Sequence, residues 1–120
     1  MKDTKTTLEE IKQIVKNFCH ERDWDQFHNA KDLAIGAVTE SSELLEHFRF
    51  LSYDQVEELM RNSEKKKEVA FELCDVLFFL VRLSERYNID LAEYFTAKME
   101  QNAQRYPVAN FKGKNHKAEH

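Results

Sequence analysis

The stretch Glu72-Leu-Cys-Asp75-Val-Leu-Phe-Phe-Leu-Val81 is apolar almost all round at helical spacing, and yet it carries two carboxylates. An apolar circumference of this kind is typical of a buried helix. The pattern extends to a long helix over 64–87, with Ser63 as its cap and Asn88 suited to its end. Such a helix favours an all-α bundle in which neighbouring helices, and a second copy of the chain, cover it.

The rest of the chain also predicts helices. Apolar periodicity places them at 7–21, 30–48, 53–61 and 91–105, and the capping candidates are Thr6 or Thr7, Asn29, Ser52 and Asp90. Glycine and proline, which strand-rich folds need at their turns, occur only at Gly36, Gly113 and Pro107. A chain of 120 residues with 42% hydrophobic content predicts one domain over 1–120. Its helical core spans about 7–106, and its polar tail over 107–120 is expected to be mobile unless a ligand orders it.

Charge and composition exclude several classes of partner. With 18 basic and 22 acidic residues, the net charge of −4 gives no positive field for a nucleic-acid backbone. No run approaches the ~20 apolar residues of a membrane span, so no membrane partner is expected. Cys19 and Cys74 lie far apart among apolar neighbours, which indicates buried, reduced thiols and a cytoplasmic protein.

Two helices carry carboxylates beside their apolar faces. At roughly 100° per residue, Glu40 points along the direction of Leu33 and Leu44, and Glu43 lies about 60° away. Glu72 and Asp75 share one narrow face of the long helix, together with Glu68 one turn earlier. An isolated ionised carboxylate in an apolar interior costs several kcal/mol, so each pair needs a positive partner.

Two kinds of positive partner are possible for these carboxylates. Arg82 or Arg86 can pair with Asp75, and Lys31 can pair with Glu40, which would make the carboxylates purely structural. Two Glu/Asp pairs on two helices favour metal instead, because one negative charge from each of four carboxylates matches two divalent cations. Oxygen ligands select a hard ion, so Mg²⁺ is expected, with Mn²⁺ as a substitute. A di-iron bundle requires Glu-x-x-His pairs, whereas His47 follows Glu43 by four residues, which makes His47 a surface or supporting residue.

A phosphate group has no glycine-rich loop to bind here, since the glycines stand far apart. Side chains, rather than backbone N–H groups, must therefore bind the phosphate. Lys98, Asn102 and Arg105 lie at i, i+4 and i+7 on the last long helix, with Tyr106 adjacent. This face suits anionic oxygens.

Four ordered blocks of the sequence resemble the all-α nucleoside triphosphate pyrophosphohydrolases of the MazG-like group, and within it the dCTP pyrophosphatase branch. The blocks are Glu21-Arg-Asp-Trp24-Asp-Gln-Phe27-His28, Glu40-x-x-Glu43-Leu with Glu46, Glu72-Leu-x-Asp75-Val-Leu, and Lys98-Met with Asn102 and Arg105-Tyr-Pro107. The resemblance spans most of the chain.

The resemblance implies a set of site residues and an assembly. It implies Mg²⁺ ligation and catalysis by Glu40, Glu43, Glu72 and Asp75, and triphosphate or sugar contacts by Lys98, Asn102, Arg105 and Tyr106. It also implies a base pocket of aromatic side chains that includes Trp24, completed when two copies pack into a dimer, with a dimer-of-dimers tetramer favoured.

Some positions differ from the resembled pattern. Thr39 stands where MazG itself has a leading Glu. The dCTP branch has Trp, Tyr and His where this chain has Phe50, Phe79 and Val15. The aromatic replacements keep a stacking surface, while a broader pyrimidine or general dNTP preference stays open beside dCTP.

The expected reaction is in-line attack of water on the α-phosphorus of a nucleoside triphosphate, which gives a monophosphate and pyrophosphate. Glu43 or Glu40 is the candidate general base. The stacking candidates are Trp24, Phe27, Phe50 and Phe79, and His28 is a candidate for the pocket wall. Two alternatives remain: a non-catalytic helical interaction module, and a phosphoribosyl-ATP-type pyrophosphohydrolase.

Overall fold

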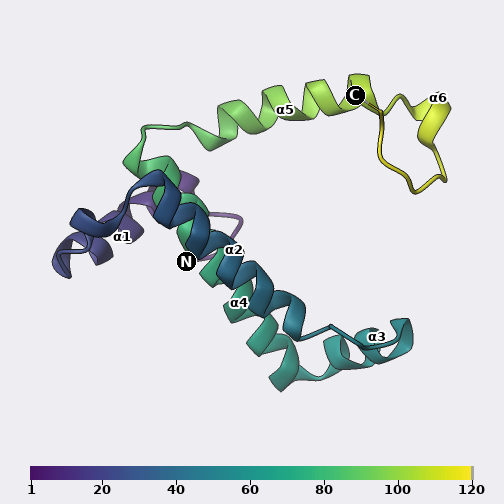
Figure 1. The fold of residues 1–120 in the computed structure, drawn as a ribbon, viewed down its shortest axis with the longest axis horizontal. Coiled ribbons are helices and arrows are strands. Elements are labelled where there is room, and N and C mark those ends of the chain that lie inside the picture. The colour runs from purple at the N-terminus through teal and green to yellow at the C-terminus, as the bar shows by residue number, and fades with distance from the viewer. Residues whose placement is uncertain (120) are drawn as a thin grey trace. The chain divides into compact units, whose positions relative to one another are not determined.

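The computed structural model of the protein describes residues 1–119, which form helices joined by short connections (Figure 1). The helices are α1 (Leu8–Glu21), α2 (Ala30–Glu46), α3 (Tyr53–Arg61), α4 (Ser63–Arg86), α5 (Leu91–Arg105) and α6 (Val108–Phe111), and a 3₁₀ turn, η1, spans Asp25–Phe27. No strand occurs within the described residues, which confirms the predicted all-α class. Each of these helices is too short or too polar to cross a membrane.

Most helix starts carry the caps that the sequence predicts. Backbone N–H groups in the first turns of α1, α2, α3 and α5 donate to the side chains of Thr7, Asn29, Ser52 and Asp90. At α4 the prediction was wrong by one residue. Asn62 is the cap, because its side chain accepts from the N–H of Lys65, and Ser63 is the first helical residue. Asn88 follows the end of α4 with a φ of 53°, the left-handed conformation that asparagine tolerates there.

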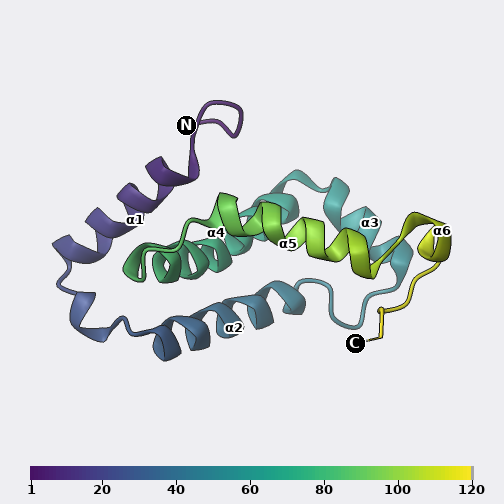
Figure 2. The same cartoon turned by 90° about the horizontal axis from the view of Figure 1, so that it is seen from above.

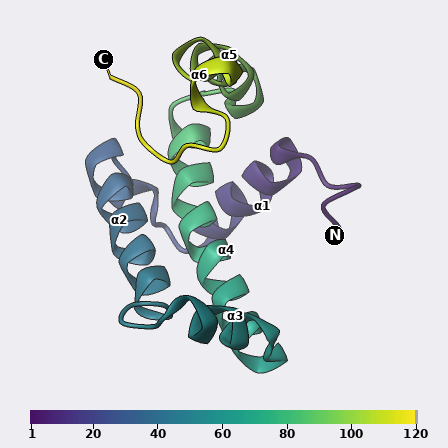
Figure 3. The same cartoon turned by 90° about the vertical axis from the view of Figure 1, so that its right-hand side faces the viewer.

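The chain divides into two compact units, Met1–Ile89 and Asp90–His120, so the single domain stays a prediction. In the first unit, α2 and α4 lie side by side (Figure 3). They are antiparallel, because Gly36 lies against the ring of Phe79 whereas Glu40, further along α2, lies near Glu72, earlier in α4. Helices α1 and α3 each pack against α4 as well.

The core of the first unit is small. Val15 and Cys19 of α1 meet Val81 of α4, and Ile11 and Phe78 pack around them. Burial of Cys19 confirms one half of the cysteine prediction, but Cys74 is exposed, so the prediction that both thiols are buried was wrong.

Much of the apolar surface of α4 is exposed in this chain. Phe71, Leu73, Leu77 and Leu80 all lie at the surface, and Val38 on α2 is exposed too. One copy of the chain therefore leaves part of this helix uncovered, as expected, and its coverage by a second copy stays a prediction. Apolar side chains at helical spacing show which faces avoid water, but they do not show whether the same chain or another molecule covers them.

The second unit contains α5, α6 and the segment after them (Figure 2). The hydroxyl of Tyr106 accepts a hydrogen bond of 3.0 Å from the N–H of Ala118, and Ala118 is buried. The ring of Phe111 lies 4.9 Å from that of Tyr106. In the structure the segment up to Ala118 folds back onto the end of α5, where the rings of Tyr106 and Phe111 pack together, and the mobility of the tail stays a prediction.

Replacement of Gly36 is expected to separate α2 from α4. A Cβ atom at this position would lie 2.3 Å from Cε1 of Phe79, so Gly36→Ala should destabilise the fold by about 1–2 kcal/mol, although alanine favours a helix by about 1 kcal/mol. Urea denaturation measures the change. In a Phe79→Ala background the same substitution should be neutral or stabilising, and an equal penalty in both backgrounds would contradict the steric explanation.

Candidate metal centre

Three of the predicted carboxylates meet between α2 and α4. Glu40 and Glu43 come from successive turns of α2, and Glu72 faces them from α4. One carboxylate oxygen of each residue lies within 4.8 Å of the others. The i, i+3 spacing on α2 and the antiparallel register of α4 together produce this acidic cluster, which can hold a metal ion.

The cluster contains oxygens that lack a partner. Among the described residues, Oε2 of Glu40 and Oε2 of Glu72 are buried and accept no hydrogen bond. The close approach of the Glu72 carboxyl, burial and the neighbouring Glu43 raise the pKa of Glu40 to about 7. Buried acceptors without donors cost free energy, and a hard divalent cation is the ligand that satisfies such oxygens. The residues present therefore fit Mg²⁺ or Mn²⁺.

The raised pKa of Glu40 predicts how stability depends on pH when no metal is bound. The folded pKa of about 7 lies above the ordinary value of 4.5, so the stabilisation by the proton is full below about pH 4.5 and is lost as pH rises through about 7. In a chelator, the melting temperature should fall between about pH 5 and about pH 8. Thermal scans of Glu40→Gln should show a flatter slope, and identical slopes would contradict this origin.

Asp75 stands apart from the cluster. It lies one turn after Glu72 on α4, but its side chain is exposed rather than buried as predicted. Within the described residues it forms no ion pair with Arg82 or Arg86, nor does Glu40 pair with Lys31. These particular structural ion pairs are thus not formed, and a ligand role for Asp75 stays a prediction.

The aromatic candidates do not form one pocket within the chain. Trp24, 38% exposed, packs edge-on against Phe18 and His28, at 5.6 and 6.2 Å between ring centroids. Phe50 is 89% exposed, with a φ of 69° and the Arg49 guanidinium 4.7 Å from its ring.

These candidates lie far apart along the fold. Trp24 precedes α2 and Phe50 follows it, and a helix of 17 residues is roughly 25 Å long. Phe79 packs between them, against Gly36 and edge-on to Phe78, while Phe27 is exposed. One base cannot contact Trp24 and Phe50 of the same chain at once.

The predicted phosphate ligands belong to the second unit, where they run from the middle of α5 to the residue after its end. Lys98 donates to Gln101 over 2.7 Å, and Asn102 lies 3.9 Å from the sulfur of Met99. Arg105 has a buried Nη2 that finds no acceptor among the described residues, and its guanidinium lies 5.7 Å from the Tyr106 ring. An arginine nitrogen without a partner is suited to an anionic ligand.

Sequence reasoning missed the polar cluster around Arg82, which was considered only as a partner for Asp75. Its guanidinium contacts Asp25, His28 and Glu85 instead. The one sequence signal for this cluster was Glu85, which lies three residues after Arg82 on the same helix and can pair with it. The other partners lie across the fold and leave no local pattern.

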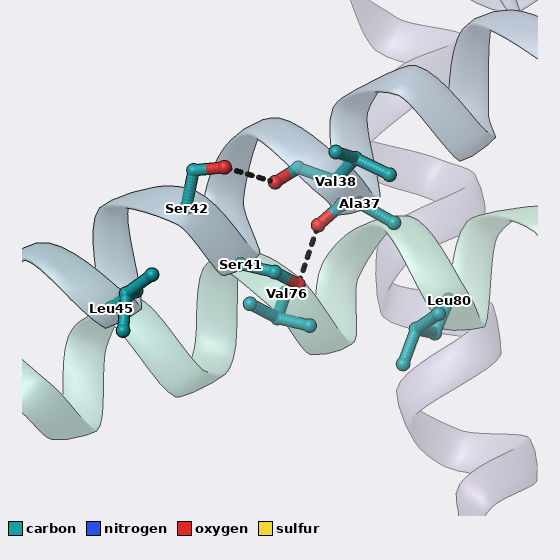
Figure 4. Close-up of a pocket in the computed structure, with 7 residues that line it drawn as sticks. All are labelled: Ala37, Val38, Ser41, Ser42, Leu45, Val76 and Leu80. Atoms are coloured by element: carbon teal, nitrogen blue, oxygen red, sulfur yellow. Dashed lines mark hydrogen bonds between the residues drawn. The ribbon is translucent and has the colours of Figure 1, made fainter.

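A shallow groove runs along α2 and α4 on the exposed side of the pair (Figure 4). Its lining residues are Ala37, Val38, Ser41, Ser42, Leu45, Val76 and Leu80. The hydroxyls of Ser41 and Ser42 donate to backbone carbonyls of α2, at 2.7 and 3.1 Å. With these hydroxyls satisfied, the groove offers apolar contacts, which suit a protein surface better than a triphosphate.

Known proteins resemble this chain in sequence and in structure. Residues 35–120 match the model of the MazG-like family. dCTP pyrophosphatase 1 of Mus musculus is 38% identical over 102 residues, which is 85% of this chain and 60% of that protein. The Homo sapiens protein of the same name is 35% identical over the same shares. The chain thus spans about 60% of the length of these relatives.

A solved structure agrees with the sequence comparison. A pyrophosphatase from Archaeoglobus fulgidus superimposes with a TM-score of 0.78 and 36% sequence identity, over 83% of this chain and 92% of that one. The family model begins at residue 35 and so includes α4 and the part of α2 that carries Glu40 and Glu43. On these grounds the chain belongs to the MazG-like family.

Proposed function

We propose that this chain is a Mg²⁺-dependent nucleoside triphosphate pyrophosphohydrolase that acts on dCTP or related pyrimidine deoxynucleotides. The observation that carries the proposal is the cluster of Glu40, Glu43 and Glu72 with two buried oxygens that lack partners. The relatives named dCTP pyrophosphatase 1 support the choice of substrate. The cellular role would be removal of unwanted nucleotides from the cytoplasmic pool.

The acidic cluster would hold the metal, with Asp75 as a further ligand one turn along α4. Bound Mg²⁺ supplies charge neutralisation for the triphosphate and acidifies water. Glu40 or Glu43 would accept the proton of the attacking water. The water oxygen bonds to the α-phosphorus, the bond from that phosphorus to the bridging oxygen breaks, and pyrophosphate leaves.

Residues outside the cluster would bind the substrate. Lys98 and Arg105 would stabilise the charge that spreads over the phosphate oxygens, with Asn102 and Tyr106 beside them. Trp24, Phe50 and Phe79 would stack on the base, and His28 would stand at the pocket wall. Because Trp24 and Phe50 lie at opposite ends of α2, this pocket would combine residues from two copies of the chain in a homodimer, or in a tetramer of paired dimers.

A substrate panel tests the function. Purified protein with Mg²⁺ is given dCTP, dTTP, dUTP, dATP, dGTP and CTP, and release of pyrophosphate is measured separately from that of orthophosphate. We expect pyrophosphate and monophosphate in equal amounts, fastest with a pyrimidine deoxynucleotide, and no turnover in a chelator. Orthophosphate as the first product would contradict attack at the α-phosphorus.

Two alternatives give different results in the same assay. A phosphoribosyl-ATP-type enzyme would release pyrophosphate from that substrate and from none of the panel. A non-catalytic helical module would release nothing, and neither Mg²⁺ nor dCTP would raise its melting temperature, because a ligand stabilises only a fold that binds it. The unpaired oxygens of Glu40 and Glu72 favour the metal-dependent enzyme.

A further inference from the structure

Arg82 on α4 is the largest fully buried side chain among the described residues, with 1% of its surface exposed. Each of its three nitrogens donates one hydrogen bond. Nε donates to Nδ1 of His28 over 2.9 Å, Nη1 to Oε2 of Glu85 over 2.5 Å, and Nη2 to Oδ1 of Asp25. A buried ion pair seldom adds stability beyond that of apolar residues of similar size, so stability alone does not account for this guanidinium.

Two of the three partners lie in the segment 24–28, more than 50 residues away along the chain. This segment lies in the loop between α1 and α2 and contains the short turn η1. Local contacts also order it, since the N–H of Trp24 donates to the carbonyl oxygen of Cys19 and the ring of His20 bonds to Asp25. Arg86 adds two bonds from the same helix, to the carbonyl oxygens of His28 and Asp25 at 3.4 and 3.3 Å. Two arginines of α4 thus bind the loop at both Asp25 and His28.

The contact with Arg82 also fixes the proton on His28. A guanidinium stays protonated and has no acceptor, so Nδ1 of His28 must accept and the ring hydrogen must reside on Nε2. Burial and the charge of Arg82 lower the pKa of His28, which keeps the ring neutral. His28 therefore offers one N–H donor, Nε2–H, beside the ring of Trp24.

We propose that Arg82 is a positioning residue for base recognition: without touching the substrate, it holds Trp24 for stacking and keeps His28 as an Nε2–H donor to an acceptor on the base edge. The proposal rests on the proposed function, since it assigns a nucleobase to this loop. The observation beneath it is geometric, because one buried side chain joins the catalytic helix α4 to both Asp25 and His28.

The first test is Arg82→Met, which keeps an unbranched side chain and removes the donors. KM for dCTP should rise at least about tenfold while kcat stays within about threefold, because binding of the base is lost equally in ground and transition states. Trp24 is the only tryptophan of the chain, so its fluorescence reports this loop alone. Acrylamide should quench it more strongly in the variant, and dCMP should bind more weakly.

Glu85→Gln is the matched control. It retains an acceptor for Arg82 within α4 and leaves the bonds to Asp25 and His28 in place, so KM and Trp24 quenching should stay within about twofold of the wild type. Arg82→Lys keeps the charge but cannot bond to all three partners, and it should raise KM in the same direction as Arg82→Met. Unchanged KM and unchanged quenching in a folded Arg82→Met or Arg82→Lys variant would overturn the proposal.

A measurement on the unaltered protein covers the case in which the variants fail to fold. Long-range ¹H–¹⁵N spectra of the imidazole rings at neutral pH should show His28 neutral, with its proton on Nε2, and an Nδ1–H tautomer or an imidazolium would overturn the proposal. Wild-type protein that hydrolyses no nucleotide would refute the proposed function instead. Trp24 quenching and the His28 tautomer would still decide whether Arg82 orders the loop.

Discussion

Glu72→Gln is expected to lower pyrophosphate release at least about 10³-fold while leaving the metal-free protein as stable as the wild type or more so. The loss follows from removal of a charged oxygen ligand that Mg²⁺ requires. Stability is retained because Oε2 of Glu72 is buried without a partner near Glu40 and Glu43, and an amide removes that repulsion, worth roughly 1–3 kcal/mol. Turnover assays and urea denaturation measure the two effects.

Glu68→Gln is the matched control for this prediction. Glu68 lies one turn before Glu72 on α4, is exposed, and pairs only with Lys65 at 3.7 Å, so its loss should change neither activity nor stability by a measurable amount. Asp75→Asn tests the exposed carboxylate independently of the acidic cluster. A large loss of turnover without a change in stability would indicate that Asp75 is a metal ligand. Near-normal turnover in Glu72→Gln would refute the metal assignment.

The helices could be predicted because their signals are local. Thr7 with Glu10, Asn29 and Asp90 each satisfy N–H groups within three residues, so the sequence alone specifies where α1, α2 and α5 begin. The start of α4 was misplaced because the side chains of Asn62 and Ser63 can both cap a helix. Only the geometry of the loop after α3 decides between them.

The acidic cluster was predictable only in part. Spacing placed Glu40 and Glu43 together on α2, but their meeting with Glu72 depends on the register between α2 and α4. That register follows from the contact of Gly36 with Phe79, which no local pattern reveals. The Arg82 network was missed for the same reason, as its partners in the loop lie 54 and 57 residues away.

The burial of Asp75 was mispredicted for a different reason. Its neighbours Leu73 and Leu77 are apolar, and helical periodicity treats such positions as covered, yet both are exposed in the single chain. A sequence pattern does not identify the molecule that covers an apolar face. The error therefore concerns assembly rather than secondary structure, and it leads to a prediction about the oligomer.

Charged substitutions in the groove between α2 and α4 are expected to dissociate the protein and abolish its activity together. Val38 and Leu80 line the groove and are 67% and 46% exposed in one copy, and apolar patches of this kind are normally covered by a partner. A second copy related by a two-fold axis would present the same patch and would cover it. Glu at position 80 or Lys at position 38 would leave a desolvated charge there, which costs several kcal/mol.

Light scattering and activity measured on the same samples test this assembly. The wild type should give a mass of at least twice the 14.3 kDa of one chain, and its melting temperature should rise with protein concentration. Leu80→Glu and Val38→Lys should approach the mass of one chain, with dissociation constants raised by about 10³-fold or more, since each 1.4 kcal/mol is worth a factor of ten. Val108→Glu is the control, because Val108 is an exposed apolar position outside the groove. This variant should change neither the mass by light scattering nor the activity.

Loss of activity on dissociation follows from the position of the aromatic side chains. Trp24 and Phe50 stand at opposite ends of α2, so under the proposed function one chain would offer a base only part of a stacking pocket. Two antiparallel copies of α2 across a two-fold axis would bring the end that carries Trp24 in one copy towards the end that carries Phe50 in the other. A dissociated Leu80→Glu chain should therefore keep its helices by circular dichroism and yet bind dCTP poorly, whereas a fully active chain of 14.3 kDa would show that one copy is sufficient.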